Sequence, residues 1–225
     1  MRYLPIMLSG MFFQLACGKV ADQSESSPRA DGNFALSHMS ETTKNAIIQA
    51  CNIDYAGIAQ TKEECYLLMA GVTVREASWN PNKSCEAWGN PSDPACGLTQ
   101  SRRKDCISVG LSGCENNAHD PILNVRTGLR NIGCEGEVEK ICLERYGNTS
   151  IDSGVKKHLG SNTRAYTSYI QAMRDVYNRE DIREHFDIKA PLRSFDTVFS
   201  SSSSLPTSEP TIVPTDAHSD VAVGG

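Results

Sequence analysis

The feature that most restricts how this chain can fold is its set of cysteines. The 225-residue sequence contains nine, of which Cys17 stands apart near the N-terminus and the other eight lie between positions 51 and 142. An even number of cysteines in a short window is typical of disulfide bonds formed in an oxidising compartment. A metal site is not expected, because no Cys-x-x-Cys pair occurs.

Eight cysteines allow many pairings, and the sequence alone does not choose among them. We expect sequence neighbours to pair, as 51–65, 85–96, 106–114 and 134–142. Each such bridge closes a small loop and contributes about 2–4 kcal/mol to the free energy of unfolding.

The first residues resemble an export signal. Arg2 supplies a positive charge, and the apolar segment from Leu4 to Ala16 is too short to span a bilayer. Residues 14–18 resemble a bacterial lipobox, which would make Cys17 the lipidated first residue of the mature protein. Cleavage by an ordinary signal peptidase is the alternative. Both alternatives predict an exported protein, in the periplasm, at the outer membrane or secreted.

Composition divides the chain into four parts. Residues 1–17 form the signal, and residues 18–36 are polar and are expected to be a flexible linker. Residues 37–192 suffice for one domain with one core. Residues 193–225 are expected to be a disordered tail rich in Ser, Thr and Pro. The net charge of −5 and the lack of a basic patch argue against nucleic-acid binding, and a monomer is expected.

Apolar residues recur at helical spacing through the domain. Thr61 and Glu64 form the pattern of a capping box, which predicts a helix start at Lys62. The predicted helices cover about residues 40–51, 62–78, 98–108, 120–133, 135–146 and 162–178. A small β-hairpin is expected between residues 83 and 95. The fold class is therefore mainly α, with a small β element and multiple disulfides.

Glu76 is the candidate catalytic residue. It continues the apolar stripe of the second predicted helix, which includes Leu68 and Val72. A carboxylate on a buried stripe is costly unless it is paired or protonated. Glu76 could therefore form a structural ion pair with a neighbour such as Arg75, or it could have a raised pKa and donate a proton in catalysis.

The residues after Glu76 favour catalysis. Trp79-Asn80-Pro81 ends the helix, and Gly97-Leu98-Thr99-Gln100 follows a polar loop that contains two cysteines. A helix with a catalytic Glu, then an aromatic-Asn-Pro, then Gly-Leu-Met-Gln is the signature of the lysozyme-like superfamily. The chain resembles its soluble lytic transglycosylases and goose-type lysozymes. Ala77 stands where these families often carry Ser, and Thr99 where they carry Met.

Three further segments carry the resemblance. Residues 120–125, followed by Gly128, are similar to the family's Asp-Pro-x-x-Asn-Ile helix, and residues 145–148 lie where these enzymes have Tyr-Asn-x-Gly, with the order altered. Residues 163–177 resemble the last family helix, in which a tyrosine reaches the cleft, and Tyr166 is the candidate. The resemblance implies the lysozyme-like α+β fold, with helices around a central helix that ends in the catalytic Glu.

The resemblance also implies an enzyme without a cofactor that cleaves peptidoglycan between MurNAc and GlcNAc. Glu76 would protonate the leaving oxygen as general acid. A lysozyme uses a second carboxylate, for which Asp93 and Glu86 are candidates, whereas a lytic transglycosylase uses the one Glu as acid and then as base. Asp93 could instead be a turn residue. The implied substrate contacts, each of which could also be structural, are Ser78, Gln100, Tyr166 and Glu86.

The tryptophans and histidines add little to the functional prediction. Trp79 and Trp88 could stack on sugar rings, although Trp79 is equally suited to the core. The five histidines are scattered through the chain, at positions 38, 119, 158, 185 and 218, and are expected to be exposed.

The acidic net charge favours one class of glycan as the expected substrate. Peptidoglycan is mostly anionic, whereas glycan without its N-acetyl groups is cationic and suits an acidic enzyme better. In this respect the chain resembles the deacetylation-specific lysozymes of predatory bacteria. The alternatives are a chitin or chitosan hydrolase of the same fold and a glycan-binding wall lipoprotein without activity.

Overall fold

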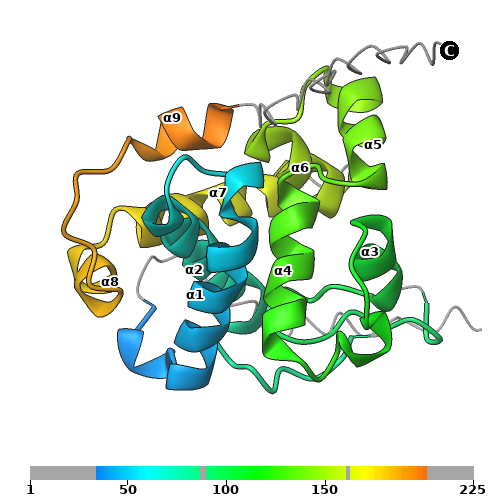
Figure 1. The fold of residues 1–225 in the computed structure, drawn as a ribbon, viewed down its shortest axis with the longest axis horizontal. Helices are drawn as coiled ribbons and strands as arrows, with labels where there is room; N and C mark the ends of the chain where they lie inside the picture. Colours follow the sequence, from blue (N-terminus) through cyan, green and yellow to red (C-terminus); the bar gives the residue numbers. More distant parts are fainter. Residues whose placement is uncertain (1–33, 87–89, 161–162, 202–225) are drawn as a thin grey trace, which may run out of the picture.

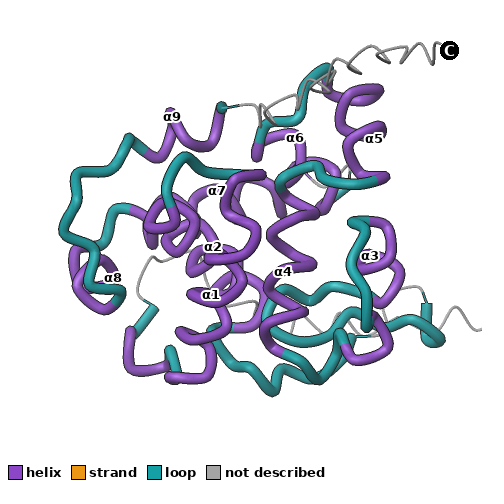
Figure 2. The backbone as a smooth tube through the Cα atoms, viewed as in Figure 1, coloured by secondary structure: helices purple, strands orange, loops and turns teal. Residues whose placement is uncertain are grey.

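The computed structural model describes residues 34–86, 90–160 and 163–201. The predicted export signal, Cys17, most of the predicted linker and the chain after residue 201 lie outside the described residues, as do Trp88 and His218. The predicted mainly α class is confirmed for the described part of the chain, in which helices account for nearly all regular structure (Figure 2). None of the described helices is both long enough and apolar enough to cross a membrane.

The described residues form nine α-helices, labelled in Figure 1. In chain order they are α1 (Glu41–Asp54), α2 (Lys62–Ala77), α3 (Arg103–Ser108), α4 (Pro121–Ile132), α5 (Glu137–Tyr146), α6 (Ile151–Leu159), α7 (Thr163–Tyr177), α8 (Glu180–His185) and α9 (Phe195–Ser200). Three short 3-10 helices are η1 (Leu36–His38), η2 (Tyr55–Gly57) and η3 (Cys114–Asn116). Helices α6, α8 and α9 were not predicted, and α3 begins later than predicted.

Helix α2 is the central helix of the domain. Every residue from Leu67 to Val74 is buried, as expected of a helix that is covered on all sides. Helix α7 packs against it so closely that a Cβ on Gly71 would lie 2.7 Å from the Cα of Met173. Helix α1 packs against both α2 and α4. In Figure 1 these four helices occupy the middle, with α3, α5 and α6 to one side and α8 to the other.

The helix starts follow from side-chain caps. Ser40 accepts a hydrogen bond from the N–H of Thr43 at 3.2 Å, and Asp120 accepts one from the N–H of Ile122 at 2.9 Å. Thr61 caps α2 by accepting from the N–H of Glu64 at 3.2 Å. Only this half of the predicted capping box forms, because the Glu64 carboxylate binds Arg193 and the N–H of Gln60 instead of the N–H of Thr61.

Glu64 is a buried carboxylate, only 2% exposed. Arg193 donates to it from Nε at 2.8 Å and from Nη2 at 2.7 Å, and the N–H of Gln60 donates at 3.0 Å. Burial raises the pKa of Glu64, but the hydrogen bonds from Arg193 and Gln60 outweigh burial, so the pKa is lowered from its ordinary value. The stability that this pair contributes is therefore complete above the ordinary carboxyl pKa and is lost as pH falls through the lowered one.

The same pair corrects the predicted domain boundary at residue 192. Arg193 joins the segment after α8 to the start of α2, and three side chains of α9 lie in the core: Phe195, Val198 and Phe199. At the other end, Phe34 packs edge-on against Trp79, with ring centroids 6.3 Å apart. The folded unit therefore extends at least from Phe34 to Ser200.

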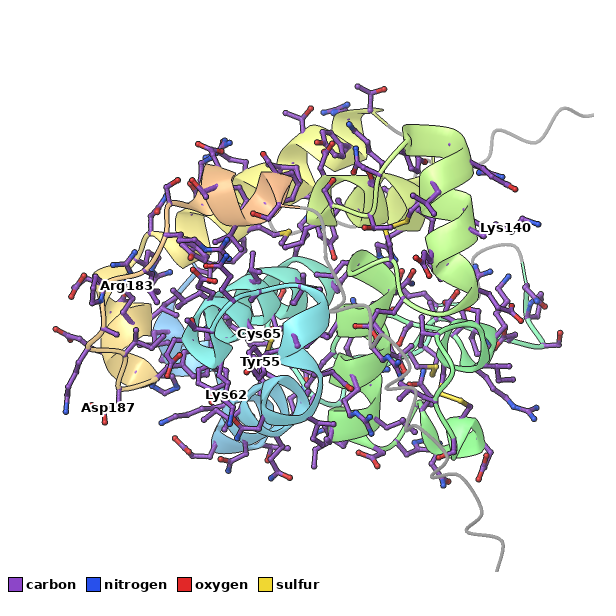
Figure 3. All side chains as sticks on the ribbon, turned by 45° about the horizontal axis from the view of Figure 1, so that its top comes forward. Tyr55, Lys62, Cys65, Lys140, Arg183 and Asp187 are labelled. Atoms are coloured by element: carbon purple, nitrogen blue, oxygen red, sulfur yellow. A yellow bond between two sulfur atoms is a disulfide. The ribbon has the colours of Figure 1, made fainter. Side chains whose placement is uncertain are left out.

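All four predicted disulfides are confirmed: Cys51–Cys65, Cys85–Cys96, Cys106–Cys114 and Cys134–Cys142. Figure 3 shows Cys65 in the interior, where its disulfide joins α1 to α2. The predicted hairpin is not confirmed. Among the described residues only two isolated antiparallel bridges occur, Glu86 with Ala95 and Cys96 with Ser101.

Replacing Arg193 with alanine is expected to lower the free energy of unfolding by about 3–5 kcal/mol, because Glu64 would stay buried without its cation. Urea unfolding with the disulfides intact measures the loss. Lys189→Ala is the control on the same segment, since Lys189 pairs with Asp187 at 3.1 Å with both side chains exposed, and such pairs contribute about 0–1 kcal/mol. Equal losses in the two variants would contradict a stabilising buried pair.

Candidate functional site

Glu76 lies at the C-terminal end of α2 and pairs with a histidine. Its side chain is 17% exposed, and its Oε1 lies 3.1 Å from Nε2 of His158 on α6. The side chain of His158 is 19% exposed, so the prediction that the histidines are exposed is wrong for this one. No ion pair with Arg75 occurs among the described residues; the Nε of Arg75 is buried without a hydrogen-bond partner.

The backbone turns sharply directly after Glu76. Ser78 and Trp79 both have positive φ, 51° and 60°, which is unfavourable for a bulky residue. Trp79 is fully buried; its Nε1 donates to the carbonyl of Ala70 at 2.9 Å, and its own carbonyl accepts from Thr43 Oγ1 at 2.7 Å. These contacts fix where α2 ends and so fix the position of Glu76. They also make Trp79 a core residue, unavailable for stacking on a sugar.

Tyr169 of α7 is the tyrosine beside this pair. Its ring centroid lies 5.9 Å from that of His158, and its buried hydroxyl has no well-aligned hydrogen-bond partner among the described residues. Burial raises the pKa of Tyr169 well above its ordinary value, and the Glu76 carboxylate lies close enough to raise that pKa further. The predicted Tyr166 instead donates its hydroxyl proton to Asp152 on α6.

Further charges surround His158. Burial lowers the pKa of His158, but the hydrogen bond and charge of Glu76, with the charge of Asp105 on α3, outweigh burial, so the pKa is raised. The positive charge of Lys157 lowers the pKa of His158. The pKa of Lys157 is itself lowered by burial, and its Nζ donates to Oδ1 of Asn131 at 2.7 Å.

The Gly97–Gln100 motif packs directly against the motif on α4. The N–H of Thr99 donates to Asn124 Oδ1 at 2.8 Å, and Asn124 Nδ2 donates to the carbonyl of Cys96 at 2.9 Å. The Thr99 hydroxyl, at the position where the resembled families carry Met, donates to the carbonyl of Asn124 at 2.8 Å. Close approach requires glycine on both sides: a Cβ on Gly128 would lie 2.5 Å from the Thr99 side chain, and one on Gly97 would lie 2.8 Å from Asn124.

The other predicted site residues have structural contacts of their own. Asp93 accepts a hydrogen bond at 3.0 Å from the N–H of Arg103, the first residue of α3. Glu86 pairs with Lys83 at 3.2 Å. Gln100 donates from Nε2 to the carbonyl of Gly97 at 2.9 Å, and its buried Oε1 has no hydrogen-bond partner in the part of the chain that the structure describes. Within the described segments, no hydrogen bond or ion pair joins Ser78, Asp93 or Gln100 to Glu76, so their roles stay predictions.

No hydrogen bond or ion pair in the described part of the chain joins residues 145–148 to Glu76. Asn148 Oδ1 instead accepts hydrogen bonds from the hydroxyls of Ser150, at 2.6 Å, and Ser153, at 2.7 Å, and so stabilises the start of α6. His158, the residue of α6 that pairs with Glu76, lies near the C-terminal end of that helix.

A pocket of about 410 Å³ lies elsewhere. It is lined by residues from the loop after Pro81, by Gly97 and Leu98, and by residues 118–121 at the start of α4; Glu76, His158 and Tyr169 do not line it. Across the described segments, no group of three or more His, Cys, Asp or Glu side chains is placed to hold a metal ion.

Comparisons with protein-family models, with curated proteins and with solved structures give no match for this chain. Any functional assignment therefore rests on the residues of the chain and their geometry.

Asn124→Ala is expected to lower the free energy of unfolding by about 3 kcal/mol, because the buried N–H of Thr99 and the buried carbonyls of Cys96 and Asn117 lose this partner. Thermal unfolding followed by circular dichroism measures the change. Asn52→Ala removes one exposed hydrogen bond, that from Tyr66 at 2.9 Å, and should cost much less. An Asn124 variant as stable as the Asn52 variant would show that the loop does not depend on this network.

Proposed function

We propose that the protein is an exported enzyme that cleaves the glycan strands of peptidoglycan, with Glu76 as general acid. The observation that supports this most strongly is the contrast between the two carboxylates of α2. Glu64 is 2% exposed and is bound by a guanidinium, which does not deprotonate. Glu76 is 17% exposed, and its partner is a histidine, which exchanges its proton near neutral pH. Glu64 is therefore structural, whereas Glu76 is suited to proton transfer.

Cleavage of a glycosidic bond requires one proton, delivered to the leaving oxygen. Cleavage of a glycosidic bond begins when an acid protonates the leaving oxygen as the bond from carbon to oxygen breaks. Glu76 would supply that proton and would then be a carboxylate able to take a proton from the incoming hydroxyl. Among the described residues, the buried Tyr169 hydroxyl and the buried Oε1 of Gln100 have no well-aligned hydrogen-bond partner, and sugar hydroxyls are groups that could satisfy them.

The contacts of the loop favour a reaction that uses one carboxylate. Asp93 already accepts the N–H of Arg103, and Glu86 already pairs with Lys83. We therefore favour the lytic transglycosylase reaction, in which the attacking hydroxyl belongs to the sugar itself and the product has a 1,6-anhydro end. Export is supported by the four disulfides, and Cys17 is the proposed lipid anchor. The acidic net charge of −5 favours deacetylated strands.

Glu76→Gln is expected to reduce the rate of glycan cleavage by at least about 100-fold, because the amide has no acidic proton that it can transfer to the leaving oxygen. The assay digests native and deacetylated peptidoglycan and identifies the new sugar ends by mass. Glu63→Gln, the same change on the same helix, is the control and should retain activity. Full activity of the Glu76 variant on both substrates would end the proposal.

Asp93→Asn separates the two possible reactions. The one-carboxylate reaction predicts that this variant keeps its activity and still produces anhydro ends. Loss of activity in a folded Asp93 variant, with reducing ends from the wild type, would instead indicate a lysozyme with two carboxylates.

Tyr169→Phe is expected to lower activity about fivefold, the effect of losing one hydrogen bond at the reacting group. Tyr166→Phe removes a hydroxyl that binds Asp152 and should change the rate much less. The comparison uses initial rates on one peptidoglycan preparation. A larger effect at Tyr166 than at Tyr169 would contradict the placement of Tyr169 at the site.

A further inference from the structure

His158 is surrounded by charged and polar groups from four helices. Glu76 of α2 lies 3.1 Å from its Nε2, and the ring of Tyr169 on α7 lies 5.9 Å away between centroids. Asp105 of α3 and Lys157 of α6 act on it through their charges, with opposite effects. Of these groups, Glu76 is the one that is hydrogen-bonded to the imidazole.

The segment that carries His158 is anchored firmly to α4. Gly154 packs so closely that a Cβ there would lie 1.9 Å from the carbonyl oxygen of Ile132. The neighbouring Lys157 donates a hydrogen bond to Asn131 at 2.7 Å. The part of α6 that directly precedes His158 is therefore held against α4 by two contacts, and a fixed backbone is the condition for orienting a second side chain accurately.

We infer that His158 is a positioning residue for Glu76. Its imidazole holds the Glu76 carboxyl in place through one hydrogen bond, and the two side chains share a single proton. This inference deepens the proposed function and rests on it. In the free protein the hydrogen bond and charge of Glu76 raise the pKa of His158, which favours the proton on the imidazole. When a glycan excludes water, the neutral pair of imidazole and carboxylic acid costs less than two buried charges, so the proton moves along the hydrogen bond to Glu76.

The proton balance closes over one cycle. Glu76 gives its proton to the leaving oxygen as the bond to the sugar carbon breaks, and it remains as a carboxylate beside neutral His158. The attacking hydroxyl then forms the new bond to that carbon and returns its proton to Glu76. No other reactant is needed, since the proton released in the second step replaces the one used in the first.

The pair gives the activity a defined pH dependence. Because the pKa of His158 is raised, the pair keeps its proton to a higher pH than a lone carboxylic acid would. Activity is therefore present below this raised pKa and is lost as pH rises through it.

Two substitutions separate positioning from proton sharing. His158→Gln keeps a hydrogen-bond donor near Glu76 but cannot carry the proton, so its activity should fall about tenfold or more at about pH 7.5 and less than about threefold at about pH 5. His158→Ala removes both roles and should lose activity at both pH values, with the larger loss at the higher one. Equal losses at every pH in both variants, or no loss in either, would overturn the inference.

A titration that needs no enzymatic activity tests the pair independently. Histidine signals in NMR spectra are followed against pH in the wild type and in Glu76→Gln, with His158→Gln assigning the signal. The His158 pKa should fall in the Glu76 variant, because burial then acts with only Asp105 to oppose it. Asp105→Asn should lower this pKa less.

The two tests distinguish the failures. A His158 titration that does not change in Glu76→Gln would overturn proton sharing, whatever the activity. If the wild-type protein cleaves no glycan but its His158 titration depends on Glu76, the proposed function is wrong. The shared proton would then still be established.

Discussion

A helix that is buried along its length can carry charge only near its ends, and α2 has a carboxylate at each end. Glu64 and Glu76 lie one turn or less from the two termini of this helix. The rest of the structure is arranged to satisfy them. At the first turn, the segment after α8 returns across the molecule to bring Arg193 to Glu64. At the last turn, α6 and α7 bring His158 and Tyr169 to Glu76.

The two solutions differ in what they permit. A bidentate guanidinium locks the Glu64 carboxylate in its charged form, and that pair serves stability. An imidazole accepts and releases a proton, and partial exposure leaves Glu76 open to a ligand. The strained turn at Ser78 and Trp79 lies directly after Glu76 and is held by buried hydrogen bonds. Backbone strain of this kind persists only where the surrounding packing enforces it, and here it fixes the end of the helix that carries the proposed acid.

Much of this arrangement follows from local sequence signals. The caps at Ser40, Thr61 and Asp120 predicted three helix starts, because the side chain that satisfies the first N–H groups is a neighbour in sequence. The four disulfides close short loops, so pairing of neighbours predicted them. The position of Glu76 near the end of a buried helix was also predicted, from periodicity and from the residues that follow it.

The remainder depends on contacts between distant segments. Helix α6 was not predicted, and its Gly154 is explained only by the carbonyl of Ile132 beside it; with the helix unpredicted, His158 could not be placed. Tyr166 and Tyr169 are three residues apart on α7, and only the rotation of that helix about its axis decides which one meets Glu76. Helix α9 did have a signal, with Phe195, Val198 and Phe199 at helical spacing, which the Ser-rich sequence around it obscured.

The most direct test of the central claim is a crystal structure of the Glu76→Gln protein with a bound oligosaccharide of alternating GlcNAc and MurNAc. The account predicts that a glycosidic oxygen lies within about 2.6–3.2 Å of the residue 76 amide, with His158 and Tyr169 beside it. An oligosaccharide bound only in the pocket at Lys83 and His119, with no sugar at residue 76, would contradict the assignment of Glu76 as the catalytic acid.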